Sequence, residues 1–225
     1  LLNQSNVYDE KNQNIISIQN LSYKYPNSDK YIIRNQNLSI KKNSFYIIRG
    51  ESGQGKSTFL DILMGILEPT NGKVKLNLKN NNIGYVSQEC FIFNDTIKNN
   101  IAIGLNQNQI DEIKVNKILK ELKLFDYFSS LKKGFDTILT SKGLNLSVGQ
   151  KQRIGIARAL YFEPEILFLD EPTSSLDTET SNIILKILNE LSKETTIVMV
   201  SHKESLDSAN KINIKLSDGN LILEQ

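Results

Sequence analysis

The stretch that most constrains the fold runs from residue 50 to residue 57 and reads Gly-Glu-Ser-Gly-Gln-Gly-Lys-Ser. It matches the pattern G-x-x-x-x-G-K-S. A compact apolar run at 45–48 precedes it, and apolar residues at helical spacing follow it over about 56–67, before Pro69. A buried strand, a glycine-rich turn and a helix in this order let backbone N–H groups and a helix N-terminus converge on phosphate oxygens. The sequence therefore predicts an α/β core with a loop, residues 50–58, that holds a nucleotide phosphate.

Each residue type in this glycine loop has a chemical reason to be there. The glycines let the backbone approach the phosphates, Lys56 places a positive charge between the β- and γ-phosphates, and Ser57 is a ligand for Mg²⁺. We expect ATP and Mg²⁺ as cofactors, with the nucleotide held by Gly50, Ser52, Gly53, Gly55, Lys56, Ser57 and Thr58.

A second candidate site is the run 166–171, Ile-Leu-Phe-Leu-Asp-Glu, which places two acids at the end of an apolar strand. Ligands of open α/β sheets bind outside the carboxyl ends of the strands. We expect Asp170 to hold Mg²⁺ through water and Glu171 to polarise the attacking water. Two adjacent acids alone more often form a solvated turn or a helix cap, so this interpretation depends on the glycine loop upstream.

The first half of the chain is predicted to contain strands near 15–21 and 45–48. Residues 73–79 alternate between polar and apolar side chains, and Asn80, Asn81 and Asn82 then turn the chain toward 83–86. We expect an antiparallel hairpin there.

The second half changes character. Helical spacing without a strand-like run predicts a mainly helical lobe over 95–163. A buried strand at 166–169, a helix over 183–191 and a β-rich run at 195–200 follow, and Asp218-Gly219 joins two short final strands.

Composition limits the remaining possibilities. The length of 225 residues fits one domain with two lobes, and a formal charge of +2 gives no reason to expect a nucleic-acid partner. The single cysteine, Cys90, excludes an internal disulfide, and the longest apolar runs are far too short to cross a bilayer. Residues 1–14 read as a linker, and a chain that begins without Met looks excised from a longer one.

A third motif identifies a family. The run 146–160, Leu-Ser-Val-Gly-Gln-Lys-Gln-Arg-Ile-Gly-Ile-Ala-Arg-Ala-Leu, resembles the signature motif and following helix of ATP-binding cassette (ABC) proteins. Ser147 and Gly149, with Gln150 beside them, offer a hydroxyl and backbone N–H groups at a helix start, which is a second anion site. Two phosphate sites in one chain imply a dimer that sandwiches ATP. The resemblance covers residues 15–223 and implies a P-loop NTPase, RecA-like core with an antiparallel β-subdomain and a helical signature subdomain.

The resemblance also implies roles for single residues. Tyr25 matches the aromatic residue that stacks on adenine, although Tyr23 lies close by as an alternative. Gln88 matches a glutamine that touches Mg²⁺ and the water, and Asp177 ends a loop, 174–177, that crosses the dimer. His202, the only histidine, matches a switch residue at the γ-phosphate.

The implied reaction is phosphoryl transfer to water, in which positioning and charge stabilisation do most of the catalysis. Glu171 acts as the base, with Lys56, Mg²⁺, His202 and the signature residues of the partner subunit around the γ-phosphate.

Two positions depart from the family pattern. Val148 stands where a second glycine is usual, which restricts the backbone and adds a side chain beside the partner's nucleotide, so we expect weakened hydrolysis. Residues 140–143, Thr-Ser-Lys-Gly, replace a segment that usually carries a glutamate in exporters, which puts the mode of coupling in doubt.

The segment 91–101, with Phe91 and Phe93, resembles the exporter version of the cassette, where these aromatics receive a membrane domain; core packing is the other interpretation. We expect the motor domain of an exporter at the cytoplasmic face of a membrane. Its partners are a second nucleotide-binding domain, identical or not, and a transmembrane domain in the same polypeptide. The alternatives are a soluble ABC ATPase of DNA repair or ribosomes and a P-loop kinase. The transported substrate is not encoded here.

Overall fold

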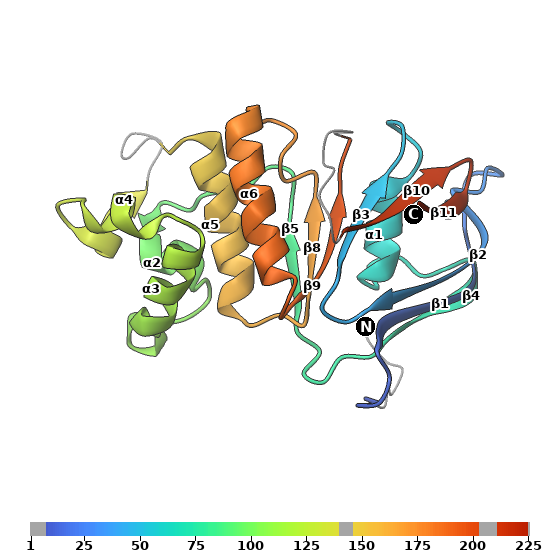
Figure 1. The fold of residues 1–225 in the computed structure, drawn as a ribbon, viewed down its shortest axis with the longest axis horizontal. Coiled ribbons are helices and arrows are strands. Elements are labelled where there is room, and N and C mark those ends of the chain that lie inside the picture. Colours follow the sequence, from blue (N-terminus) through green and yellow to red (C-terminus); the bar gives the residue numbers. More distant parts are fainter. Residues whose placement is uncertain (1–7, 140–145, 203–210, 225) are drawn as a thin grey trace.

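A computed structural model describes residues 8–139, 146–202 and 211–224 of the chain. The elements form a central sheet with helices on both faces, a smaller antiparallel sheet at one end and a helical region at the other (Figure 1). None of the helices in these three ranges has the length and apolar character needed to cross a bilayer.

The central sheet has six strands in the order β11-β10-β3-β9-β8-β5. Its pairs are parallel from β10 to β5, and β11 is antiparallel to β10. Their bounds are β3 Phe45–Arg49, β5 Ile83–Val86, β8 Ile166–Asp170, β9 Thr196–Val200, β10 Lys211–Ser217 and β11 Asn220–Glu224. The predicted strands at 45–48, 166–169 and 195–200 and the final pair joined by Asp218-Gly219 are confirmed.

The sheet separates two hydrophobic cores, and this explains why its central strands read as unbroken apolar runs. Ile47, Leu167 and Met199 face one core, which they share with α5 Val148–Tyr161 and α6 Thr178–Leu191. Their chain neighbours Ile48, Phe168 and Val198 face the other core, which contains Phe59 and Leu60 of α1 Lys56–Leu63. Helices cover both faces, so no position on these strands needs to be polar.

The predicted hairpin between 73–79 and 83–86 is wrong. Strand β4 Asn71–Leu76 pairs instead with β1 Asn14–Tyr23, which also pairs with β2 Ile33–Lys41 in a three-stranded antiparallel sheet. Strand β5 joins the central sheet parallel to β8. Gly84 permits this close approach, because a Cβ there would lie 2.8 Å from Leu167 Cδ1. The carboxylate of Glu165 accepts hydrogen bonds from the backbone N–H groups of Lys79 and Asn80 and so directs the connection toward β8.

Helices are the main regular elements among the described residues between β5 and α5. This region contains α2 Ile97–Ile101, η1 Gln107–Gln109, α3 Glu112–Glu121, α4 Phe125–Ser129 and η2 Gly134–Asp136. One short strand pair, β6 Asp95–Thr96 with β7 Ile138–Leu139, was not expected. Buried side chains of α3 and α5 belong to the same core as β8, so this region packs continuously onto the sheet.

One further boundary differs from the sequence interpretation. Helix α1 ends at Leu63, and Gly65 with φ 75° turns the chain before the predicted end at 67. At the start of the described chain, Asp9 and Asn12 hydrogen-bond to the buried side chain of Asn77 just after β4.

Candidate active site

The glycine loop lies between the carboxyl end of β3 and the start of α1, at the edge of the sheet where β8 and β9 also end (Figure 1). Gly50 has no room for a side chain, since a Cβ there would lie 2.5 Å from Leu216 O. Gly55 adopts φ 96° and is the N-cap of α1 without any side-chain cap. Among the described residues, the first N–H groups of this helix therefore have no side-chain cap, and they suit an anion.

Lys56 is buried and curls back over its own loop. Its Nζ donates hydrogen bonds to Gly50 O at 3.0 Å and to Glu51 O at 2.8 Å. Burial lowers the pKa of Lys56, while the charges of Glu171 and Asp170 act in the opposite direction. The loop thus holds one cation in place, within the electrostatic field of the two predicted acids.

Asp170 and Glu171 stand at the end of β8. Asp170 Oδ1 is buried and, among the described residues, has no hydrogen-bond partner. Such an orphaned carboxylate oxygen fits a hydrated Mg²⁺, which prefers a few carboxylate and hydroxyl ligands and retains its waters. Ser57 is exposed at the second position of α1 and can supply the hydroxyl.

Glu171 turns sharply out of the strand, with φ 47°. A non-glycine residue with a positive φ is strained, and such strained residues cluster at functional sites. His202 Nε2 lies 2.6 Å from Glu171 Oε1, just after β9. The predicted base and the predicted switch residue are therefore in direct contact.

Gln88 is connected to Glu171 through Ser174. Its Nε2 donates to Ser174 Oγ at 3.3 Å, and Ser174 Oγ donates to the backbone O of Glu171 at 3.0 Å. Ser174 was predicted only as part of the 174–177 loop. Its role as a bridge depends on contacts between residues 86 positions apart, which the sequence does not reveal.

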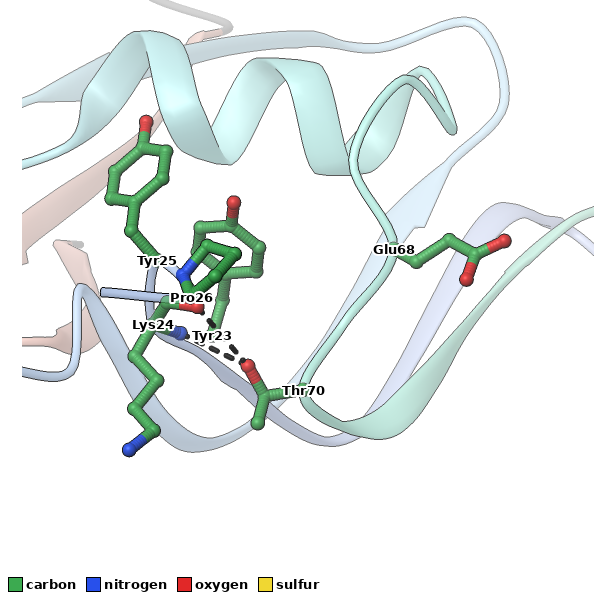
Figure 2. Close-up of a pocket in the computed structure, with 6 residues that line it drawn as sticks. All are labelled: Tyr23, Lys24, Tyr25, Pro26, Glu68 and Thr70. Atoms are coloured by element: carbon green, nitrogen blue, oxygen red, sulfur yellow. Dashed lines mark hydrogen bonds between the residues drawn. The ribbon is translucent and has the colours of Figure 1, made fainter. Parts of the chain in front are cut away.

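Exposure distinguishes the two candidate tyrosines. Tyr25 is 42% exposed and its hydroxyl lies 2.9 Å from Thr58 Oγ1, whereas Tyr23 is 5% exposed. A surface cavity of ≈ 290 Å³ lies beside the two tyrosines. Figure 2 shows the side chains that line it and the hydrogen bonds that join Lys24 and Thr70. Only Tyr25 has a ring free enough to stack on a base, so we retain Tyr25 for that role.

The signature residues form a separate group at the start of α5. Ser147 is the N-cap, and a capping box joins it to Gln150: Gln150 N donates to Ser147 Oγ, and Ser147 N donates to Gln150 Oε1. These hydrogen bonds close on each other and do not reach the glycine loop. A Cβ at Gly149 would lie 2.4 Å from Thr180 Cγ2, so this glycine is also needed for the close packing of α5 on α6.

Val148 corrects one part of the sequence argument. It is the first residue of α5 and its φ is not positive, so the backbone here does not require glycine. Its side chain is 52% exposed. The exposed side chain, and not an unusual backbone conformation, therefore distinguishes Val148 from the glycine that is usual here.

Asp177 is the N-cap of α6. It accepts a hydrogen bond from Thr180 N at 2.9 Å, which lowers the pKa of its carboxyl group. It stays charged and fixed at a helix start. The segment 140–143, the other departure from the family pattern, lies outside the described residues.

Comparisons with known proteins agree with this geometry. The family model described as ABC transporter matches residues 33–174. The chain is 38% identical, over 207 residues, to a probable ABC transporter ATP-binding/permease protein of Haemophilus influenzae; the match covers 88% of this chain and 37% of that protein. It is 36% identical over 217 residues to the multidrug resistance-like ATP-binding protein MdlB of Buchnera aphidicola, with 92% and 37% covered.

A solved structure is also similar. The ATP-bound structure of a bacterial Atm1-family ABC exporter matches with a TM-score of 0.81 and 29% identity, covering 97% of this chain and 40% of that one. The chain thus spans about two fifths of the length of these proteins. From the family model, the relatives and the fold together, the chain belongs to the ABC transporter family.

Proposed function

We propose that residues 15–225 are the ATP-hydrolysing motor domain of an ABC exporter, with a helical signature subdomain at about 95–163. The observation that carries this proposal is the cluster at the carboxyl ends of β3, β8 and β9. There a buried lysine in a glycine loop lies in the field of two acids, and the second acid contacts a histidine. This arrangement suits positioning and charge stabilisation of a transferring phosphoryl group.

In this proposal the nucleotide phosphates lie against the N-terminus of α1 and Lys56, and Tyr25 stacks on the base. Ser57, Gln88 and Asp170 hold Mg²⁺, which when bound neutralises charge on the phosphate oxygens. Glu171 accepts the proton of the attacking water. His202, held against Glu171, contacts the γ-phosphate.

The second half of the site comes from another nucleotide-binding domain, which is either identical or related. Ser147 Oγ accepts a hydrogen bond within its own chain and keeps its hydroxyl proton to donate. We propose that Ser147, Gly149 and Gln150 of one domain face the γ-phosphate bound to the other, with Asp177 near the interface. ATP would then close the dimer.

A transmembrane domain in the same polypeptide is the second proposed partner. The supporting observation is that relatives described as ATP-binding/permease proteins are much longer than this chain. Phe91 and Phe93 are 68% and 43% exposed and form an edge-to-face pair, as a docking site for a membrane domain needs. The domain would then work at the cytoplasmic face of a membrane.

The experiment is hydrolysis and transport by the full-length protein in lipid vesicles. We expect Mg²⁺-dependent ATP hydrolysis and ATP-dependent movement of a substrate across the membrane. A gene with neither a fused nor a companion membrane domain would contradict the exporter role and favour the soluble ABC ATPase. A folded protein that binds nucleotide but does not hydrolyse ATP would contradict the motor role.

A further inference from the structure

The hairpin of β10 and β11 contacts the glycine loop at two places, the start of the loop and its tip. At the start, Leu216 O closes the space in which Gly50 would carry a Cβ. At the tip, the side-chain oxygen Gln54 Oε1 accepts a hydrogen bond of 3.2 Å from the backbone N–H of Asp218. Gln54 occupies a position where the glycine-loop pattern accepts any residue, so nothing in the pattern suggests a role for its side chain.

The turn that Gln54 contacts is itself held firmly. Asp218 and Gly219 adopt φ 48° and 80°, which is the tight turn of the hairpin. On its other side, Gly219 O accepts a hydrogen bond of 2.9 Å from Arg34 N, and Leu221 N donates to Gln36 Oε1 at 2.9 Å. The turn is therefore a fixed support between β2 and the glycine loop.

On this side of the loop, Ile32 packs against Gly55, and the described side-chain hydrogen bond to the tip is the one of Gln54. A small cavity of ≈ 100 Å³ lies there, lined by Lys30, Arg34, Gln54 and Asp218 among others. Glycine-rich segments lose much conformational entropy when they become ordered. A loop whose tip is already fixed loses less of it when a nucleotide binds.

We propose that Gln54 is a positioning residue for nucleotide binding, which holds the glycine loop in its binding conformation by tying its tip to the Asp218-Gly219 turn. The inference rests on the proposed binding of ATP to this loop. Gln54 has no described contact with Glu171 or His202, so its effect belongs to nucleotide affinity and not to the chemical step. It acts on ATP and ADP alike, because both carry the phosphates that the loop holds.

The test compares Gln54→Met, which keeps the length of the side chain and removes the acceptor, with two controls in the full-length protein. Gln36→Met removes the other side-chain acceptor of the same hairpin without touching the glycine loop. Asp218→Asn keeps the backbone N–H and tolerates positive φ. Displacement of a fluorescent nucleotide gives the Kd values of ATP and ADP, steady-state hydrolysis gives kcat and KM, and hydrogen exchange reports the protection of residues 217–220.

For Gln54→Met we expect both Kd values and the KM to rise about 3- to 10-fold, the effect of one lost hydrogen bond, with kcat within about 2-fold of the wild type. Exchange at 217–220 becomes faster. Asp218→Asn keeps wild-type affinity, and Gln36→Met loses less affinity than Gln54→Met, because the Gln54–Asp218 and Arg34–Gly219 hydrogen bonds remain. Unchanged affinity in Gln54→Met, an equal loss in Gln36→Met or a fall in kcat alone would each overturn the proposal. A wild-type protein that does not bind ATP would instead contradict the proposed function.

Discussion

Glu171 combines a strained backbone with a short contact to His202, and both features make its carboxylate a fixed group. Glu171→Gln keeps the size of the side chain and a hydrogen-bonding oxygen for the histidine but removes the base. We expect ATP turnover to fall about 100-fold or more, because a positioned general base contributes about that much, while ATP affinity stays within about 3-fold.

The measurements for this variant are phosphate release under saturating ATP and nucleotide affinity by displacement. Glu165→Gln is the matched control, since Glu165 precedes the opposite end of the same strand, where it only anchors a loop. Its turnover should stay within about 2-fold of the wild type, as for residues outside the chemistry. Equal turnover in Glu171→Gln and the wild type would remove Glu171 from the catalytic role.

Val148 gives a second prediction at the level of single residues. Its side chain is exposed at the first position of α5 in a helical backbone, so bulk beside the partner subunit's nucleotide is the proposed cause of weakened hydrolysis. Val148→Gly and Val148→Ala should then raise turnover alike. We expect a gain of about 2- to 10-fold in both, which corresponds to about 0.4 to 1.4 kcal/mol in the transition state.

Comparison of the two substitutions separates the causes. A gain confined to Val148→Gly would indicate that the backbone freedom of glycine matters after all, and an unchanged rate in both would show that Val148 does not limit hydrolysis. Steady-state rates at saturating ATP, with the melting temperature as a check on folding, decide between these outcomes.

At the scale of elements, the strands that were predicted well are those whose sequence signal is local. Residues 45–49 and 166–170 are buried on both sides, so their apolar runs predict strands without knowledge of any partner. Strand β4 has the alternating pattern of a half-exposed strand, but such a pattern does not specify a neighbour. Its pairing with β1 instead of β5 depends on Gly84 and Glu165, which act only in the folded chain.

The same distinction applies to the candidate site. The glycine loop and the two acids each follow a strand in sequence, so their positions could be predicted from motifs. The bridge from Gln88 to Ser174 and the tie from Gln54 to Asp218 join residues 86 and 164 positions apart. Such pairs are set by tertiary packing, which no local pattern encodes.

Helix α5 connects the signature motif to the exposed aromatic pair, and Arg158 makes the connection. Its Nε donates to Asn100 O at 3.0 Å, its Nη2 donates to Phe91 O at 2.9 Å, and its guanidinium lies 5.2 Å from the centre of the Phe93 ring. A lysine cannot reproduce this planar set of donors. Arg158→Lys should therefore loosen Phe91 and Phe93 relative to α5.

In the full-length protein we expect Arg158→Lys to reduce transport per ATP hydrolysed at least about 2-fold, with stability lower by about 1 to 3 kcal/mol for the lost charged hydrogen bonds. Arg153→Lys is the matched control on the same helix, since Arg153 donates to Leu122 O, Lys123 O and Gly149 O, away from the aromatics, and transport is compared per ATP hydrolysed because Gly149 belongs to the signature. The stability of Arg153→Lys should also fall, while its transport per ATP hydrolysed stays at the wild-type value. Equal coupling in both variants would separate Arg158 from the membrane partner.

For the whole molecule, the proposed division of the site between two chains predicts how the oligomeric state depends on nucleotide. The signature group caps its own helix and the glycine loop holds its own lysine, so each of these two groups keeps its shape through hydrogen bonds of its own. The phosphates of ATP are the proposed link between the halves. We expect the isolated chain to be a monomer without nucleotide and the Glu171→Gln variant to form a stable dimer with ATP, because hydrolysis no longer removes that link.

Light scattering after size-exclusion chromatography measures this change directly. Adding Val148→Arg to Glu171→Gln is the critical control, because Val148 is exposed at the signature and takes no part in the capping box. A bulky cation there should keep the protein monomeric while ATP still binds to the glycine loop, since the two groups lie in different parts of the chain. A dimer that persists without nucleotide, or that tolerates the arginine, would mean that the interface lies elsewhere and that the signature does not complete the site.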